Sequence, residues 1–369
     1  MSAFSIEIAG LADDIPLQSL MSQCPMEGRI RMCFLTSPRY FDSIGVMGKF
    51  NQAVVVRDSH SGKIVGFGAR CIKPAYLNGQ VRSLGYLSHL RSIPDYRRAT
   101  LLARGYRYLK SLHGDGRAPL YISTIIEGNA YAKEQLTSRR CGLPGYYDQG
   151  VYYTCALAIK KDTRASHPEI NVQRGSVDLL DGIVSCLNRN GSTKQFYPYY
   201  TKDDFISGKE FLRGFCISDF YVAMKQGKIV GVAGKWDQRS FKQAVIAGYS
   251  GSVGVMRPFY NLAARFLRLP KLPAPKTHLA FFYLSFIAVD ADDREIFRAL
   301  VRSVCNDPKN THFPYFIIGL HSRDPLLKLV RAYRHVKYAS RLYAVCWDDG
   351  DQLRLSLDGR VPYLEAAAL

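Results

Sequence analysis

The chain has 369 residues, of which 47% are hydrophobic, 12% aromatic and 22% charged, a composition that predicts a folded protein with room for two domains and argues against disorder. Fifty Lys and Arg against 31 Asp and Glu give a formal charge of +19, which favours anionic partners such as phosphorylated cofactors, acidic proteins, RNA or membrane surfaces. The sequence shows no signal peptide and no apolar run long enough to span a membrane, so we expect a cytoplasmic protein. Its nine cysteines include no CxxC pair, so we expect reduced thiols and neither a zinc site nor a disulfide framework.

The first fifty residues predict a strand, a helix and a pocket-lining segment. Phe4 to Ile8 alternates as a strand does, and LADDIPLQSLMSQC follows as a helix that Asp13 or Asp14 can cap. The aromatic, glycine-bearing segment from Pro38 to Phe50 predicts a loop or second helix beside a pocket. Two β-rich runs then flank DSHSG, which indicates a hairpin from residue 53 to residue 72.

The segment from Tyr86 to Leu109 has the layout of a phosphate site. An interior strand turns at Pro94, presents Arg97 and Arg98, and continues into an apolar-striped helix. A helix start carries unpaired N–H groups and a partial positive charge, so an anion binds there readily.

An internal duplication relates the two halves of the chain. GKIVG occurs at Gly62 and again at Gly227, an offset of 165, and YLS occurs at Tyr86 and again at Tyr283, an offset of 197. The buried-strand runs 121–126 and 315–318 come next, and closing hairpin patterns follow at 152–159 and 341–347. The two offsets differ by 32 residues, which predicts an insertion in the second copy at 256–277, read as a helix and a proline-rich loop.

This order of elements resembles the GNAT acyltransferase superfamily, with the whole chain as a tandem pair. The resemblance implies an α/β fold in which each copy has a central mixed sheet flanked by helices. The polar stretch from Lys160 to Pro168 predicts the linker. We therefore expect a donor-binding domain at 1–162 and a degenerate second domain at 163–369.

The resemblance also implies which residues hold the donor. In the family, a bulge in the central strand supplies a backbone N–H, here expected near Leu90 to Ser92, and a glycine-containing loop cradles the cofactor pyrophosphate. Here Thr100 and Leu102 replace both glycines, and the second copy, from Arg294 to Ala299, also lacks them and has acids around it. The family asparagine signature matches NAYA, which the second copy lacks. The expected donor-binding residues, all in the first copy, are Leu90, Arg91, Ser92, Arg97, Arg98, Ala99, Thr100, Leu101, Leu102 and Asn129.

Three residues are candidates for proton transfer between an amine and a thioester. His89 lies in the central strand, where the second copy has Phe286; the alternative is that both rings fill core volume. Glu127, at the end of the following strand, is a second candidate base or a solvated strand terminus. The tyrosine that the family often uses as the acid is replaced by Leu136. The possible substitutes are Tyr131, Tyr146, Tyr147 and Tyr152, of which Tyr131 is taken as the candidate.

The sequence therefore predicts an N-acyltransferase that moves an acyl group to the amine of a small molecule or peptide. The donor is acyl-CoA or the acyl-phosphopantetheine of an acidic acyl carrier protein, which would suit a basic surface, and no metal is expected. One alternative is a Fem-type aminoacyl transferase that uses charged tRNA; the sequence has neither its coiled-coil arm nor a basic-aromatic RNA motif, which argues against nucleic acid. The other alternative is an inactive tandem module for binding or assembly.

Overall fold

The computed structural model describes residues 3–25, 30–96, 99–139, 142–163, 167–208, 210–267 and 271–369. Short 3-10 turns link many of its elements. In the first half the helices and strands are β1 (Phe4–Ile8), α1 (Asp14–Gln23), β2 (Ile30–Leu35), α2 (Tyr40–Gly45), β3 (Phe50–Asp58), β4 (Ile64–Leu77), β5 (Gln80–Ser92), α3 (Ala99–His113), β6 (Tyr121–Ile126), α4 (Ala130–Thr137) and β7 (Gly145–Ala158).

The second half repeats this order with additions. Its elements are β8 (Asn171–Arg174), α5 (Leu180–Gly191), β9 (Lys194–Gln195), α6 (Lys202–Ile206), β10 (Phe220–Lys225), β11 (Lys228–Trp236), β12 (Gln243–Tyr249), α7 (Ser252–Leu267), β13 (Phe281–Val289), α8 (Arg294–Asn306), β14 (Tyr315–His321), α9 (Leu327–Val330), β15 (His335–Cys346), α10 (Asp351–Leu355) and β16 (Val361–Pro362).

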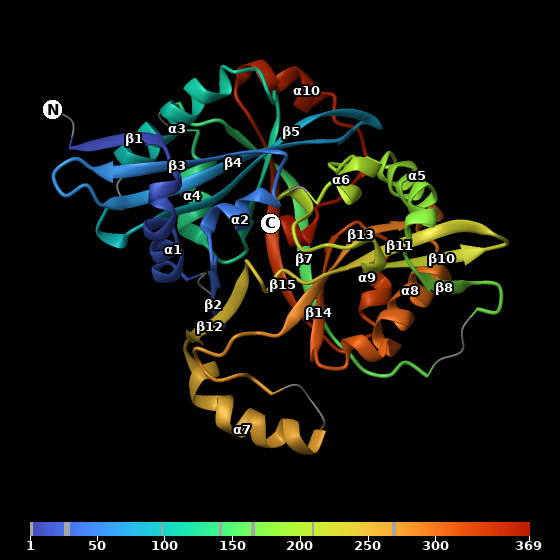
Figure 1. The fold of residues 1–369 in the computed structure, drawn as a ribbon. Coiled ribbons are helices and arrows are strands. Elements are labelled where there is room, and N and C mark those ends of the chain that lie inside the picture. Colours follow the sequence, from blue (N-terminus) through green and yellow to red (C-terminus); the bar gives the residue numbers. More distant parts are fainter. Residues whose placement is uncertain are drawn as a thin grey trace.

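One mixed sheet of twelve strands runs through the molecule in the order β1-β3-β4-β5-β6-β15-β7-β14-β13-β11-β10-β8 (Figure 1). The predicted mixed sheets are therefore confirmed, and they are continuous. The closing strands cross between the halves: β15 pairs with β6, β7 pairs with β14, and the two also pair with each other over twelve positions. Each half thus completes the sheet of the other, in place of the two separate closing hairpins that the sequence predicts.

Helices cover both faces of the sheet. In the first half, α1 and α2 pack on one face through Leu17, Leu20 and Tyr40, and α3 and α4 pack on the other through Tyr106 and Leu136. In the second half, α5 and α8 lie on opposite sides of the strands (Figure 1). Burial of these apolar faces is the main stabilising contribution to both halves.

The predicted insertion is present between β11 and β13. It begins with β12, which pairs with β2 of the first half in a separate two-stranded sheet, and continues into α7. Figure 1 shows α7 at the far end of this β2–β12 ribbon, away from the main sheet. None of the described helices combines the length and the apolar character that crossing a membrane requires.

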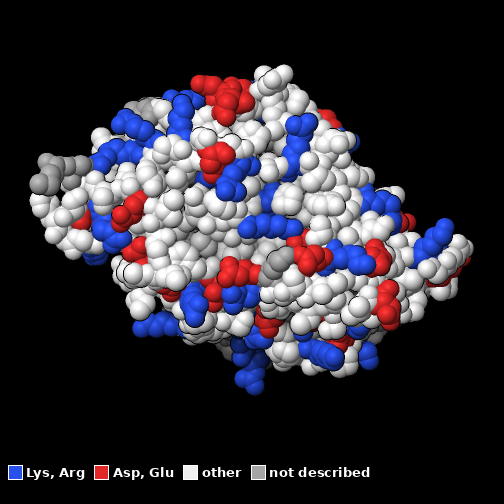
Figure 2. Space-filling model, turned by 45° about the horizontal axis from the view of Figure 1, so that its top comes forward, with Lys and Arg blue, Asp and Glu red and all other residues white. Residues whose placement is uncertain are grey.

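The charge of the protein is spread out on the face that Figure 2 shows. There, Lys and Arg alternate with Asp and Glu, and no single large basic patch forms. The excess of basic residues therefore acts on this face as many separate positive sites.

Candidate functional site

The first copy has a gap between two parallel strands that diverge. The parallel strands β5 and β6 pair at two positions only: Gly85 pairs with Tyr121, and Tyr86 pairs with Ile122. Beyond this point the backbone pairing ends, although the hydroxyl of Ser123 still donates to the carbonyl oxygen of Leu87 at 2.9 Å. α3 follows β5 and α4 follows β6, so the start of each helix lies at the open end of the gap.

A β-bulge interrupts β5 at this place. Ser88 pairs with Ala69 and Arg91 pairs with Phe67, so that Gly68 alone faces two residues, His89 and Leu90. A bulge leaves its extra residue out of the hydrogen-bond ladder and turns it toward a ligand or a neighbouring element. The sequence places the bulge at 90–92, and the structure places it one residue earlier.

His89 occupies the bulge in a left-handed conformation with φ of 54°. This region is uncommon for residues other than glycine, and such strain concentrates at functional sites. Nδ1 of His89 lies 3.1 Å from the hydroxyl oxygen of Tyr40, which is fully buried at the start of α2. Tyr40 belongs to the aromatic segment for which the sequence predicts a pocket-lining role.

The surroundings of His89 favour its neutral form. Its burial lowers the pKa of the imidazole well below 6.5, and the positive charges of Arg91 and Lys242 lower it further. Burial also raises the pKa of the Tyr40 phenol, which therefore stays protonated. In the tautomer whose Nδ1–H donates to Tyr40, Nε2 of His89 is a free acceptor.

Lys242 is a member of this cluster that sequence reasoning missed. It precedes β12, is only 7% exposed, and its ammonium donates to the backbone oxygen of Leu369 at 2.6 Å. Burial lowers its pKa to about 8. Because Lys242 lies 153 positions beyond His89 in the sequence, no local pattern could have indicated that its charge acts on the pKa of His89.

The predicted anion-binding turn is only partly described. Arg97 and Arg98 lie outside the described residues, and so does the side chain of Ala99, the first residue of α3. Thr100 is exposed, whereas Leu101 is buried against Val56 and Val65. Leu102 is partly buried in the core beneath α3. Leu101 and Leu102 thus anchor the helix by their side chains and have only backbone amides to offer an anion.

Two other predicted donor-binding residues, Arg91 and Ser92, follow the bulge directly. The guanidinium of Arg91 is partly buried among Cys24, Cys33 and Tyr40, on the α1 and α2 side of the sheet, and burial lowers its pKa. The carbonyl of Ser92 accepts from the thiol of Cys24 at 3.7 Å. Arg91 therefore adds positive charge next to His89.

The residues at the end of β6 have structural partners. Glu127 is exposed, and its carboxylate lies 3.3 Å from Arg341 of β15. The side chain of Asn129 caps α4 by accepting from the amide of Ala132 at 3.0 Å. Tyr131, in the first turn of α4, is 50% exposed. No described contact joins any of the three to His89.

The second copy repeats the bulge with different surroundings. Phe286 also has φ of 54°, and the register of β13 against β11 shifts at Ala233. Here the backbone amide of Phe286 donates to Glu365 at 2.8 Å, and the hydroxyl of Tyr363 donates to the same carboxylate oxygen at 3.0 Å. The C-terminal segment of the described chain therefore fills the position beside the second bulge.

The start of α8 is filled in the same way. Asp293 caps this helix by accepting from the amides of Glu295 and Ile296 at 2.7 and 3.1 Å. The carboxylate of Asp290 is paired with Arg189 at 2.8 Å. The helix-start amides that bind anions elsewhere are thus occupied by a side chain of the protein itself.

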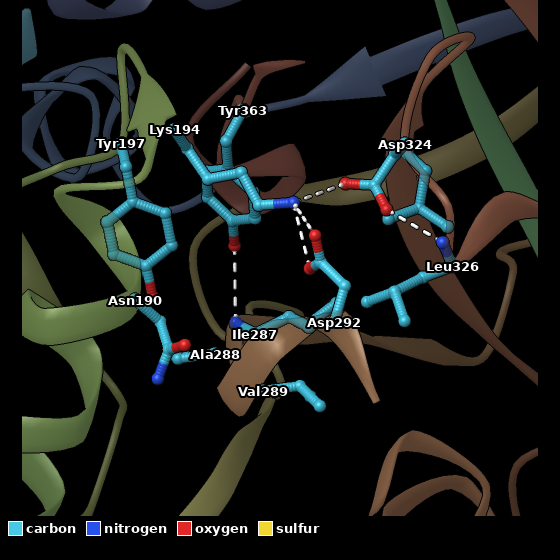
Figure 3. A pocket seen from close by; sticks show the side chains of 11 residues that line it. Asn190, Lys194, Tyr197, Ile287, Ala288, Val289, Asp292, Asp324, Leu326 and Tyr363 are labelled. Carbon is cyan, nitrogen blue, oxygen red and sulfur yellow. Dashed lines mark hydrogen bonds and ion pairs between the residues drawn. The ribbon is translucent and has the colours of Figure 1, made fainter. Parts of the chain in front are cut away.

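A small pocket remains in the second copy, lined by residues of β13, β14 and the C-terminal segment (Figure 3). Lys194 points into it with its ammonium 2.8 Å from Asp292 and 3.5 Å from Asp324. The amide of Ile287 donates to the hydroxyl of Tyr363 at 3.3 Å. The ammonium of Lys194 is therefore satisfied by carboxylates of the pocket, whereas the buried hydroxyl of Tyr197, which also lines it, has no hydrogen-bond partner among the described residues.

Comparisons with known proteins identify the fold. No family model matches the sequence, and no curated protein matches it significantly. Among solved structures, N-myristoyltransferase of Saccharomyces cerevisiae with bound myristoyl-CoA is 12% identical, with a TM-score of 0.59 over 94% of this chain and 79% of that one.

Two further structures agree with the first. A GCN5-related N-acetyltransferase from Sphaerobacter thermophilus is 11% identical, with a TM-score of 0.55 over 93% of this chain and 96% of that one. A GCN5-related glucosamine N-acetyltransferase region of a fungal multi-domain GH3 β-N-acetylglucosaminidase is 14% identical, with a TM-score of 0.61 over 93% of this chain and 38% of that one. The chain therefore has the GNAT fold, in the two-copy arrangement that the sequence predicts.

Proposed function

We propose that the chain is an N-acyltransferase that takes an acyl group from an acyl-CoA bound in the first copy and transfers it to an amine. The observation that carries the proposal is the asymmetry of the two bulges. The bulge at His89 lies at a gap between diverging strands, whereas the bulge at Phe286 is hydrogen-bonded to Glu365.

The donor would lie in the gap between β5 and β6. The pantetheine arm would run along the edge of β5, with the thioester carbonyl accepting from backbone amides at the bulge of His89 and Leu90. The pyrophosphate would lie at the start of α3, where helix amides and the charges of Arg97 and Arg98 favour an anion. Preoriented amides stabilise the oxyanion as the amine attacks the carbonyl carbon.

His89 is the group best suited to accept the proton of the attacking amine. It is neutral near pH 7, and Tyr40 holds its ring by a hydrogen bond. The same positive charges of Arg91 and Lys242 that lower the pKa of His89 would also lower the pKa of an ammonium bound beside it. The acceptor would thus reach its nucleophilic form more easily, and the tetrahedral intermediate would then collapse with loss of the CoA thiolate.

Glu127 and Tyr131 fit the proton-transfer roles less well. The carboxylate of Glu127 is exposed and held by Arg341 of β15, and Tyr131 projects from α4. We therefore assign Glu127 a role in joining β6 to β15. The leaving thiolate has no side chain assigned to it, since CoA thiolate is a good leaving group.

Acyl-CoA is preferred over the other donors by the likeness to the structure with bound myristoyl-CoA. The proposal is tested with the purified chain by two measurements: the shift in melting temperature, and the consumption of the donor in the presence of an amine. Consumption is followed as free thiol for acyl-CoA and acylated acyl carrier protein, and as deacylated tRNA for charged tRNA. The ligands are acetyl-CoA, myristoyl-CoA, acylated acyl carrier protein and charged tRNA.

A rise in melting temperature and amine-dependent thiol release with acyl-CoA are expected, since a ligand of the native state stabilises it. Stabilisation and turnover only with charged tRNA would favour an aminoacyl transferase instead. A chain that no donor stabilises, and that turns over none, would favour the inactive binding module.

A further inference from the structure

The helix α7 carries its apolar side chains on the outside. Val255, Phe259, Leu262 and Phe266 are 74, 70, 60 and 77% exposed. Their spacing of four, three and four residues places them in one stripe along the helix. Met256, beside the stripe, is 59% exposed.

The inward face of α7 is held by polar contacts. The guanidinium of Arg257 donates to the carbonyl oxygens of Leu272 and Pro273 at 3.2 and 3.1 Å. Asn261 exchanges two hydrogen bonds with the backbone of Leu272, at 2.7 and 3.0 Å. The polar side of the helix thus faces the protein and the apolar side faces away from it, which is the reverse of a helix that covers a core. Polar anchoring fixes the orientation in which the stripe is presented.

The charge around the stripe indicates what covers it. From residue 239 to residue 289 the sequence contains no Asp or Glu, and it contains seven basic residues: Arg239, Lys242, Arg257, Arg265, Arg268, Lys271 and Lys276. Arg265, Lys271 and Lys276 are exposed. Within the described ranges none of these three forms an ion pair with a carboxylate. An apolar stripe flanked by unpaired cations is complementary to an anionic surface with an apolar interior.

We propose that α7 is an interfacial anchor that docks the protein on an anionic lipid bilayer. The apolar stripe would enter the boundary between headgroups and acyl chains, and Arg265, Lys271 and Lys276 would lie against the headgroup phosphates. The helix would lie in the plane of the membrane, in keeping with its length and with its position at the tip of the β2–β12 ribbon (Figure 1). This inference does not depend on acyl transfer.

The test is co-sedimentation of the full chain with vesicles. One set is phosphatidylcholine alone and the other is phosphatidylcholine mixed with phosphatidylglycerol. We expect sedimentation with the anionic vesicles, weakening as salt is added because the charge contribution is screened. The double variant Phe259→Glu with Phe266→Glu should reduce the partition coefficient about tenfold or more.

The matched control is the double variant Val177→Glu with Leu355→Glu, which changes two apolar side chains that are 70 and 71% exposed elsewhere on the molecule. This control variant adds the same two negative charges as the α7 variant but leaves the apolar stripe intact. Its partition coefficient for anionic vesicles should therefore stay well above that of the α7 variant. Circular dichroism and melting curves should be the same for both variants, since all four side chains are exposed.

Three results would overturn the proposal. One is the absence of sedimentation with anionic vesicles, and another is equal sedimentation of the two double variants. The third is a protein contact in place of the lipid contact: a dimer, or a complex with acidic acyl carrier protein, that the α7 variant abolishes while vesicles are not bound.

Discussion

His89 and Phe286 occupy the same bulge in the two copies, each with φ of 54°. The two copies therefore share the backbone conformation of the bulge but differ in the side chain that it carries. The Phe286 ring is fully buried, stacked on Trp236 and in edge contact with Tyr200. The imidazole of His89 is only partly buried and contacts Tyr40.

His89→Phe should remove turnover and leave the fold intact. The second copy shows that a phenylalanine is accommodated at this backbone conformation. Loss of a general base lowers the rate by about 10²–10⁴-fold. The measurement is kcat for thiol release, with the melting temperature as a check on folding. A variant with wild-type kcat would remove His89 from the mechanism.

Phe286→His is the reciprocal control for that experiment. It places a polar ring in a fully buried aromatic cluster. We expect a loss of about 2–4 kcal/mol in the free energy of unfolding. Because the second bulge is not assigned to the reaction, kcat per folded molecule should stay unchanged.

Glu365→Ala should strongly destabilise the second copy. The Glu365 carboxylate accepts from the amide of Phe286 and the hydroxyl of Tyr363, and its side chain is 4% exposed. Removing it leaves buried donors without a partner and opens a cavity, at a cost of about 2–4 kcal/mol. Urea denaturation measures the change.

Glu127→Ala is the matched control for Glu365→Ala, because it removes an exposed carboxylate paired with Arg341. Its expected cost is below about 1 kcal/mol. The same variant tests the alternative base: a fall in kcat as large as that of His89→Phe would move the proton-transfer role from His89 to Glu127.

The sequence was informative wherever a feature is local. The strands 4–8 and 121–126 have the predicted bounds, and the predicted helix and proline-containing return of the insertion are present after β12. The bulge is displaced by one residue only. Alternation, glycine and proline act over a few residues, so they can be recognised in one chain.

The sequence could not predict the exchange of strands between the two halves or the burial of charged side chains. The alternating pattern of β7 and β15 shows which face is buried but not which neighbour each strand chooses, so the crossing between halves could not be seen. Lys and Glu are residue types that usually lie in solvent, and only the packing of distant segments shows that Lys242 and Glu365 are buried. The roles of His89, Glu127 and Tyr131 remain predictions.

Lys242 makes stability depend on pH in alkaline solution. Burial lowers its pKa to about 8 from 10.5. Between these values the unfolded chain binds the proton and the native chain does not, so the free energy of unfolding rises with pH in this window. The full shift corresponds to about 3 kcal/mol. Lys242→Met should show a flatter rise from pH 8 to pH 10.5 in urea denaturation.

The comparison of wild type with Lys242→Met isolates this group, because Lys73, whose pKa burial also lowers to about 8, is present in both proteins. Equal slopes for the two proteins would show that Lys242 titrates normally.

Arg97→Glu combined with Arg98→Glu should abolish donor binding without unfolding the chain. The two arginines precede the start of α3, where the proposed pyrophosphate site combines helix amides with positive charge. Reversing both charges should weaken CoA binding by about 100-fold or more, as measured by calorimetry. The control is Arg294→Glu, an exposed residue at the start of α8, where Asp293 already caps the helix. That variant should bind CoA as wild type does, because the second copy takes no donor. If Arg294→Glu weakens binding and the double variant does not, the donor site lies in the second copy.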